Sequence, residues 1–409
     1  MLKRTLPFLL SATYLFAQSA DVESAEKSQA VDPDTLQQWL RDKRMISVRE
    51  LGGDLSISGD VRTEFQATNE TKNGIKQRGS YGACDRPANA WDVEFNLMLD
   101  YRTERTWAAV KLEFDNDMGQ RSGTLSNIRL EKAYLGGRII YGDTFTFDGE
   151  VGRRNFYNVF DSKIEFASLF DGLLFRFSKA SEHIGDAYVN AAAFLIDDKT
   201  NHYGYVAEVG LLRFANTGIN IKYSLMDWRK HFPNDLTTDR YRFIVGQALL
   251  QYQCNPDWMG GRLLLLYGAF LNNFIAKPIA ITAHQKASQG VYAGFTVGQV
   301  RRAGDFAVDA NFQWVQAQAI PDFDVSGIGR GNACRIGLYT NNINGSGGAT
   351  TNATAVGSCN YKGFVIDALY AFTDNLTINQ NYQMSWTLNR NIGPNLQLKQ
   401  FETEFIYAF

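Results

Sequence analysis

The chain lacks, after its first twenty residues, any uninterrupted apolar run of about 18 residues, the length an α-helix needs to cross a bilayer. It also lacks a Walker loop, a Gly-x-Ser-x-Gly elbow, a His-Glu-x-x-His motif and a Cys-x-x-Cys pair. Only 4 His, 4 Cys and 8 Pro occur among 409 residues. These absences exclude membrane-spanning helices, and we expect no metal, no cofactor and no catalytic residues.

Histidine placement argues against an enzyme in the same way. Barrel-shaped lipases and proteases use a histidine base beside a Ser or Asp partner. All four histidines of this chain fall in predicted loops or turns: His183, His202, His231 and His284. A barrel enzyme is therefore the least favoured alternative.

The chain also has no large excess of positive or negative charge. The 41 basic and 43 acidic residues leave a net charge of −2, so no strongly basic surface is available for nucleic acid. Hence we expect no nucleic-acid partner.

The first nineteen residues have the layout of a secretory signal peptide. Two cations, Lys3 and Arg4, precede a short apolar run and small residues at Ala17 and Ser19. Residues 20–54 then form a predicted periplasmic arm, with a short helix from Pro33 to about residue 45. A plug in the lumen or a contact with neighbouring subunits are the alternatives for this arm.

The last nine residues alternate strictly between two faces. Phe401, Phe405, Tyr407 and Phe409 share one face, while Glu402 and its neighbours at alternate positions share the other. This pattern is typical of a strand with one face on lipid and the other in a lumen, although the edge strand of a soluble sandwich also alternates.

Similar alternation recurs through residues 55–409. The segment 91–102 is the cleanest, and its length suits a membrane strand better than an ordinary strand of about 5–6 residues. We predict sixteen strands near 55–67, 91–102, 106–115, 124–137, 144–154, 169–178, 187–196, 203–212, 218–228, 241–253, 261–272, 290–299, 304–316, 363–372, 376–387 and 397–409.

The connections between these strands are unequal. Three-residue turns at 103–105 and 373–375 fall on the predicted periplasmic side, and the long connections 68–90 and 317–362 fall outside. The expected fold is all-β: one transmembrane antiparallel β-barrel of about 16 strands with a short N-terminal helix. The strands near 187–196 and 261–272 are apolar almost throughout, which indicates a subunit interface or a filled lumen.

The less apolar face of each strand is predicted to line a water-filled lumen, because charges face hydrocarbon only at high cost. Acids and bases nearly match there, so ion preference stays open. The predicted wall residues are Arg62, Glu94, Arg102, Lys111, Arg129 and Glu131.

Cysteines divide between the two sides of the predicted barrel. Cys334 and Cys359 flank a Gly- and Asn-rich tract in the longest loop, and we predict a disulfide between them in an oxidising compartment. Cys254 lies on the opposite side, so it is predicted to be free or intermolecular, and Cys84 could also form an intermolecular disulfide.

The aromatic terminus resembles the C-terminal signature of bacterial outer-membrane proteins. The stretch 147–177 resembles the region of general-diffusion porins in which the third loop folds into the barrel. That resemblance implies that Asp161 and Glu165 are loop carboxylates facing the wall cations Arg154 and Arg176. This connection has about 14 residues and lacks the Pro-Glu-Phe-type motif of such loops.

The ending, from Asn391 to Phe409, resembles the porin family of chlamydial outer membranes. The resemblance to porins implies an outer-membrane channel for passive diffusion of small hydrophilic solutes and ions. It further implies a homotrimer in contact with membrane lipids and lipopolysaccharide. An adhesin or structural barrel with a blocked lumen is the main alternative.

Overall fold

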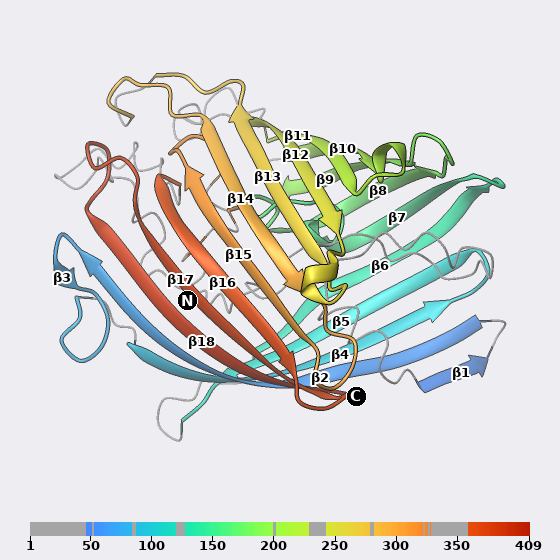
Figure 1. The fold of residues 1–409 in the computed structure, drawn as a ribbon, viewed down its shortest axis with the longest axis horizontal. Helices are drawn as coiled ribbons and strands as arrows, with labels where there is room; N and C mark the ends of the chain where they lie inside the picture. The colour runs from blue at the N-terminus through green and yellow to red at the C-terminus, as the bar shows by residue number, and fades with distance from the viewer. Residues whose placement is uncertain are drawn as a thin grey trace.

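Sixteen strands close into one antiparallel barrel in the computed structural model (Figure 1). The predicted signal peptide and N-terminal helix lie outside the described residues. The structure describes residues 46–50, 53–83, 87–119, 127–198, 202–228, 243–278, 282–321, 324–325, 328 and 359–409.

The barrel strands follow one another around the ring in chain order. They are β2 (Gly53–Lys72), β4 (Asn89–Arg102), β5 (Thr106–Asp117), β6 (Asn127–Tyr141), β7 (Phe145–Asn155), β8 (Leu169–Lys179), β9 (Asp186–Asp197), β10 (His202–Leu212), β11 (Ile219–Asp227), β12 (Ile244–Cys254), β13 (Leu264–Asn273), β14 (Gln289–Gly298), β15 (Phe306–Val315), β16 (Tyr361–Ala371), β17 (Leu376–Thr387) and β18 (Leu396–Ala408). Two short strands, β1 (Ile46–Glu50) and β3 (Ile75–Lys76), pair with the two ends of β2. The 3-10 turns are η1 (Phe156–Asn158), η2 (Phe214–Asn216) and η3 (Asp257–Met259).

Closure joins the last strand to the first barrel strand. β18 pairs with β2 from Leu396 opposite Lys72 to Ala408 opposite Asp60. Gly59 and Phe409 then exchange two backbone hydrogen bonds of 3.0 Å. Position 59 needs glycine, because a Cβ there would lie 2.4 Å from the carbonyl oxygen of Asn96. The closed ring leaves no unpaired strand edge between β2 and β18.

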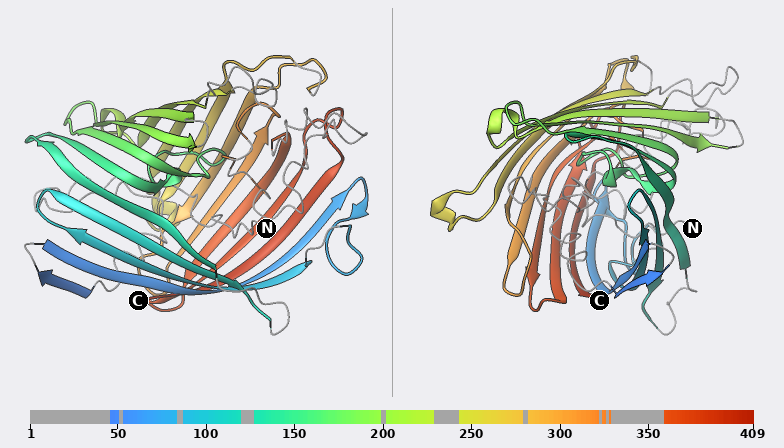
Figure 2. Two further views of the ribbon diagram at one scale, coloured as in Figure 1. Left: turned by 180° about the vertical axis from the view of Figure 1, so that it is seen from behind. Right: turned by 90° about the vertical axis from the view of Figure 1, so that its right-hand side faces the viewer.

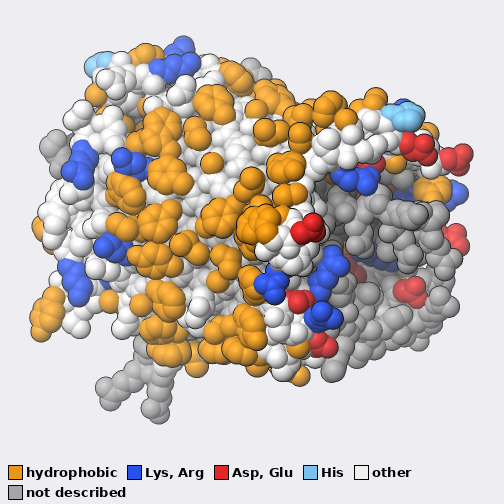
Figure 3. All heavy atoms as spheres, in the orientation of Figure 1, with side chains coloured by type: hydrophobic (Ala, Val, Ile, Leu, Met, Phe, Trp, Pro, Cys, Tyr) orange, Lys and Arg blue, Asp and Glu red, His pale blue; other side chains and the backbone are white. Residues whose placement is uncertain are grey.

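Side chains alternate between the two faces of the wall as predicted. On β18, Phe401, Phe405 and Tyr407 are exposed on the outside, whereas Glu402 and Glu404 are buried inside. Figure 3 shows hydrophobic side chains gathered in a broad band over β13–β18, with Lys and Arg side chains toward its two ends. An apolar outer band and a polar inner face fit a wall between lipid and lumen.

The two ends of the barrel differ. Residues 103–105 and 372–375 make tight turns, in which the hydroxyl oxygens of Thr103 and Thr373 each accept a hydrogen bond of 3.0 Å from the backbone N–H three residues on. We call this the short-turn end, at the lower right of Figure 1. The opposite, long-loop end carries the connections 73–88, 156–168, 274–288 and 316–360.

No helix among the described residues is long and apolar enough to span a bilayer.

The described cysteines lie at opposite ends. Cys254 ends β12 at the short-turn end with a free thiol. Cys359 is buried at the long-loop end, where its Sγ lies 3.1 Å from the carbonyl oxygen of Ile320. Cys84 and Cys334 lie outside the described residues, so the disulfide between Cys334 and Cys359 stays a prediction.

Arginine at two outward positions of β16 tests whether the apolar band contacts lipid. Ile366 lies at mid-strand and Tyr370 near the short-turn end, both on the outside. Ile366→Arg should lower the free energy of unfolding in phospholipid vesicles by about 2–4 kcal/mol, and Tyr370→Arg by only about 0–1 kcal/mol. Urea titration measures both. Equal losses at the two depths would contradict a lipid-facing band.

Candidate functional site

The connection between β7 and β8, residues 156–168, folds into the barrel. We call it the inward loop, and it is visible inside the ring of strands in the right-hand view of Figure 2. Its apolar side chains would be exposed to water if the loop projected from the rim, which explains its inward course. The buried apolar residues of the loop are Phe156, Val159, Phe160, Ile164 and Phe166.

One side of the barrel wall is apolar on its inner face and receives this loop. The inward side chains of β9 and β13 include Phe194, Leu265 and Leu271, which belong to the same buried cluster as Phe156. The strands that the sequence marked as apolar throughout therefore face a filled part of the lumen. The apolar inward residues of these two strands are therefore explained by the filled lumen and require no subunit interface.

Aromatic rings fix where the inward loop begins. The ring of Phe156 lies 4.8 Å from that of Phe170 on β8 and 4.7 Å, edge-on, from that of Phe194 on β9. Trp228, just after β11, meets Phe194 at 5.2 Å. Edge-to-face and offset contacts of this kind stabilise ring pairs beyond their buried area.

Asp161 anchors the middle of the loop to the wall. Its carboxylate lies 2.7 Å from the ammonium of Lys222 on β11 and accepts a hydrogen bond of 3.0 Å from Gln251 on β12. Gln247 donates to its carbonyl oxygen at 2.6 Å, and its backbone N–H donates to Glu208 on β10 at 3.2 Å. Three neighbouring strands thus hold one loop residue.

Lys163 makes a second ionic anchor two residues later. Its ammonium lies 3.1 Å from Asp309 on β15 and 5.0 Å from the ring centre of Tyr267 on β13. The Tyr267 hydroxyl and Thr296 also donate to the Asp309 carboxylate, at 2.8 Å and 2.7 Å. The two anchors have opposite sign, so the loop binds both an acidic and a basic position of the wall.

A residue of the 316–360 connection holds the end of the inward loop. The Asp324 carboxylate accepts hydrogen bonds from the backbone N–H groups of Phe166, at 3.1 Å, and Ser168, at 3.2 Å, and from the Ser168 hydroxyl. Burial raises the pKa of Asp324 to about 7, although the hydrogen bonds that its carboxylate accepts act to lower this pKa. Burial also raises the pKa of Glu165 well above its usual value, and the nearby Asp324 charge raises it further.

The predicted cations meet a different partner from the one expected. Arg154 and Arg176 both contact Glu150 on the wall, Arg176 at 3.7 Å, and Arg154 also stacks 4.1 Å from the ring centre of Tyr134. The expectation that Asp161 would face these arginines is corrected. The loop turns toward β10–β15, so Asp161 reaches Lys222 instead.

Most of the remaining predicted wall residues form ion pairs. Arg62 on β2 contacts Asp60, Glu94 at 3.8 Å and Glu404 at 3.4 Å. The other predicted positions are Lys111, which pairs with Glu131; Arg129, which is half-exposed 3.8 Å from Glu113; and Arg102, which is exposed at the short-turn end of β4.

Two important residues were missed. Glu208 lies on the inner face of β10 and is the one acidic residue in that mostly apolar strand, so an isolated charge could have identified it. Asp324 lies in a long connection without any periodic pattern, and no sequence signal indicated that it would meet the inward loop.

Comparisons with known structures agree on the fold. Pseudomonas putida OprB is 11% identical, with a TM-score of 0.51, covering 87% of this chain and 94% of that one. Salmonella typhi OmpF, in complex with daunomycin, is 13% identical, with a TM-score of 0.51, covering 89% and 100%. Both are bacterial outer-membrane porins. No family model matches the chain, and no curated protein sequence matches it. At these identities the similarity supports the barrel fold alone.

Replacing Lys222 tests the first anchor. Lys222→Gln leaves the buried Asp161 carboxylate without its cation, so the free energy of unfolding should fall by about 3–5 kcal/mol. Adding Asp161→Asn removes the uncompensated charge and should recover much of that loss. Urea titration of both single variants and the double variant measures the coupling. Strictly additive losses would show that the two side chains act independently.

Raising the pH from about 4 to above 7 should lower the stability of the inward loop beside Asp324. The pKa of Asp324 is raised from an unfolded value of about 3.9, so its contribution is greatest at low pH and falls as pH rises toward 7 and through it. Hydrogen exchange of the Phe166 and Ser168 amides, corrected for intrinsic rates, should therefore show less protection above pH 7. Asp324→Asn serves as the control and should flatten this dependence; an unchanged slope in that variant would assign it to another group.

Proposed function

We propose that this protein is a porin of a bacterial outer membrane, a channel for passive diffusion of small hydrophilic solutes and ions. The observation that carries the proposal is the inward loop, which is bonded to the wall inside a closed sixteen-strand barrel. A barrel of this size without such a loop leaves a wide aqueous channel, and an ordered loop narrows it.

The distribution of inward residues supports a passage along one side. The inward loop packs against the apolar inner faces of β8–β14. The opposite inner wall, formed by β18, β2 and β4–β7, is rich in charged side chains, including Arg62, Glu94 and Glu150. Charged side chains suit the water side of a passage because they need solvation or partners.

A barrel with a blocked lumen remains the second candidate. Its supporting observation is the low exposure of several inward charged residues: Asp60 at 1%, Glu402 at 0% and Glu404 at 3%. An adhesin or structural barrel would have such an interior. Conductance separates these two functions directly.

The finer features follow the resemblance to porins. We propose export by cleavage after about residue 19, assembly as a homotrimer, and contact with lipopolysaccharide and other membrane lipids. Cys254 at the short-turn end is available for an intermolecular disulfide, as is Cys84 by its predicted loop position. Intact mass of the purified protein tests the cleavage, and native mass spectrometry with and without reductant tests the assembly.

Planar-bilayer recording tests the channel itself. The purified chain should give stepwise conductance that is ohmic near zero voltage, because a fixed aqueous path needs no energy source. Asp161→Asn should shift the reversal potential toward anions, since Lys222 would then lose its counter-charge. Arg154→Gln with Arg176→Gln should shift it toward cations, since Glu150 would remain.

Charge removal elsewhere on the wall provides the control for this experiment. Glu402→Gln lies far along the ring from the Lys222 anchor and should shift the reversal potential less than Asp161→Asn does. Equal shifts would mean that the field is spread over the whole wall. Insertion without conductance would replace the porin proposal by the blocked-barrel one.

A further inference from the structure

Four carboxylates form one row across the inner wall, next to the seam where the barrel closes. Glu404 on β18 is directly opposite Glu64 on β2. Asp92 on β4 is the partner of Glu64 on its other side, and Asp117 on β5 is the partner of Asp92. The four strands are neighbours in the wall (Figure 1). We call these four residues the acid row.

The acid row runs obliquely along the height of the barrel. Barrel strands are tilted by about 35–45°, so residues that pair across successive strands lie at successive heights. Asp117 ends β5 at the long-loop end, whereas Glu404 lies near Ala408, where β18 ends beside the short turns. Neighbouring strands are about 4.8 Å apart, so the three steps of the row cover about 14 Å. The row therefore leads from the long-loop end into the interior.

Such a row lowers the stability of the wall. Like charges that lie directly opposite one another on neighbouring strands are destabilising. The guanidinium of Arg62, in the adjacent row, contacts Asp60 on its own strand. It also lies 3.8 Å from Glu94 and 3.4 Å from Glu404, so three carboxylates share this one positive charge. A local arrangement that opposes stability is typical of a functional site.

Glu404 faces a crevice of the lumen and has an acceptor atom that the wall does not use. Its residue is only 3% exposed, and its Oε2 atom has no hydrogen-bond partner within the described part of the chain. A buried carboxylate oxygen without a donor costs free energy, so we expect a ligand to supply the donor. The crevice is lined by Arg62 and by five carboxylates, which are those of Glu64, Asp92, Glu94, Asp115 and Glu404.

A linear cation fits the acid row better than a single metal ion does. Among the described residues, no group of three or more His, Cys, Asp or Glu side chains is arranged to hold a metal ion. The row instead places negative charges one after another, with about 4.8 Å between neighbouring strands. Ammonium groups spaced along an aliphatic chain can each form a charge-assisted hydrogen bond with a carboxylate. Linear aliphatic polyamines have this pattern of charge.

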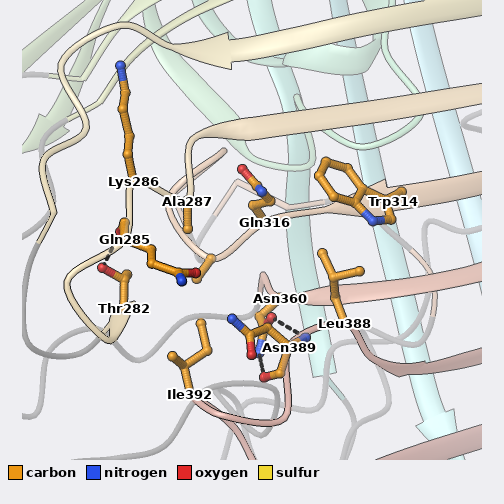
Figure 4. Close-up of a pocket in the computed structure, with 11 residues that line it drawn as sticks. Thr282, Gln285, Lys286, Ala287, Trp314, Gln316, Asn360, Leu388, Asn389 and Ile392 are labelled. Atoms are coloured by element: carbon orange, nitrogen blue, oxygen red, sulfur yellow. Dashed lines mark hydrogen bonds between the residues drawn. The ribbon is translucent and has the colours of Figure 1, made fainter.

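A separate cavity at the long-loop end does not suit a cation. It has a volume of about 190 Å³, and Figure 4 shows the amide side chains of Gln285, Gln316 and Asn389 around it. Its one charged lining residue among the described residues is Lys286, which would repel a polyamine. We therefore expect the acid row, and not this cavity, to bind one.

We propose that the acid row binds a linear aliphatic polyamine inside the lumen, with successive ammonium groups on successive carboxylates. The inference deepens the proposed function and rests on it, because a polyamine reaches the row only through a water-filled passage. The ligand would meet Asp117 first, at the long-loop end, and Glu404 last. Clefts lined by one sign of charge concentrate ions of the opposite sign, which favours entry of such a solute.

Isothermal titration calorimetry of the full-length protein in a neutral detergent tests this site. The probe is spermine, a linear tetra-amine, and one molecule per chain should bind. Putrescine, a linear diamine, should bind at least about tenfold more weakly, because it meets fewer carboxylates. Mg²⁺ should also bind at least about tenfold more weakly, because a single ion cannot contact carboxylates spread over four strands.

A double variant removes the two central charges of the acid row. Glu64→Gln with Asp92→Asn should weaken spermine binding at least about tenfold, and Glu64→Gln alone should give an intermediate loss. Far-UV circular dichroism checks that each variant keeps its barrel. The matched control is Glu104→Gln with Asp143→Asn, which removes the same charge from two exposed residues at the short-turn end and should leave binding unchanged.

Two outcomes would overturn the inference. One is spermine binding that the folded double variant leaves unchanged; the other is Mg²⁺ binding as tight as spermine. Conductance of the same preparations in planar bilayers separates this result from the proposed function. A conducting protein that fails to bind spermine refutes only the site, and a silent protein that binds it refutes only the channel.

Discussion

Backbone hydrogen bonding around a closed ring is the constraint on which the rest of this structure depends. A spanning wall in lipid cannot leave N–H or C=O groups unpaired, so its first and last strands must meet. Here β18 pairs with β2 along its whole length, and the pairing continues through Gly59 to the terminal Phe409. The register at this seam places Phe405 outside and Glu404 inside, and every neighbouring strand inherits that division of faces.

A closed barrel of this size has a wide interior, and the inward loop fills part of it. A ring of sixteen strands encloses more space than its own side chains fill. The apolar residues of the loop fill one side of that space by packing against inward aromatic and aliphatic side chains. Two ion pairs of opposite polarity, Asp161 with Lys222 and Lys163 with Asp309, then fix the loop's position. Packing alone is non-directional, so these charged contacts specify which strands the loop meets.

The sequence predicted the periodic part of this architecture well. Two-residue alternation, which a single chain segment shows by itself, predicted the sixteen strands and the inward position of Arg62, Glu94 and Lys111. The tight turns followed from the short gaps between alternating segments. β6 shows the limit: bulges near Glu131 and Ile139 shift the register and change which residues face inward. A bulge inserts one residue without any composition signal, so alternation cannot locate it.

The contacts of the inward loop were less predictable for a different reason. Its inward course follows from its apolar residues. Its ionic partners, however, lie far along the chain: Lys222 is 61 residues from Asp161, and Asp309 is 146 residues from Lys163. Many inward charges of either sign were available, and local sequence does not rank them. The resemblance to porins suggested Arg154 and Arg176, which instead both contact Glu150 on the same wall.

One strand shows how alternation lets a thin wall act on both sides. The inward residues of β15 include Asp309, which binds Lys163, and Gln313, which donates to the Lys163 carbonyl oxygen at 3.4 Å. Trp314, the next residue along, lies on the outward face that Phe312 shares. Because adjacent side chains point to opposite faces, the lumen and the lipid surface are separated by a single residue step. A displacement of β15 would therefore move the lumen-facing partners of Lys163 and the outward side chains of the same strand together.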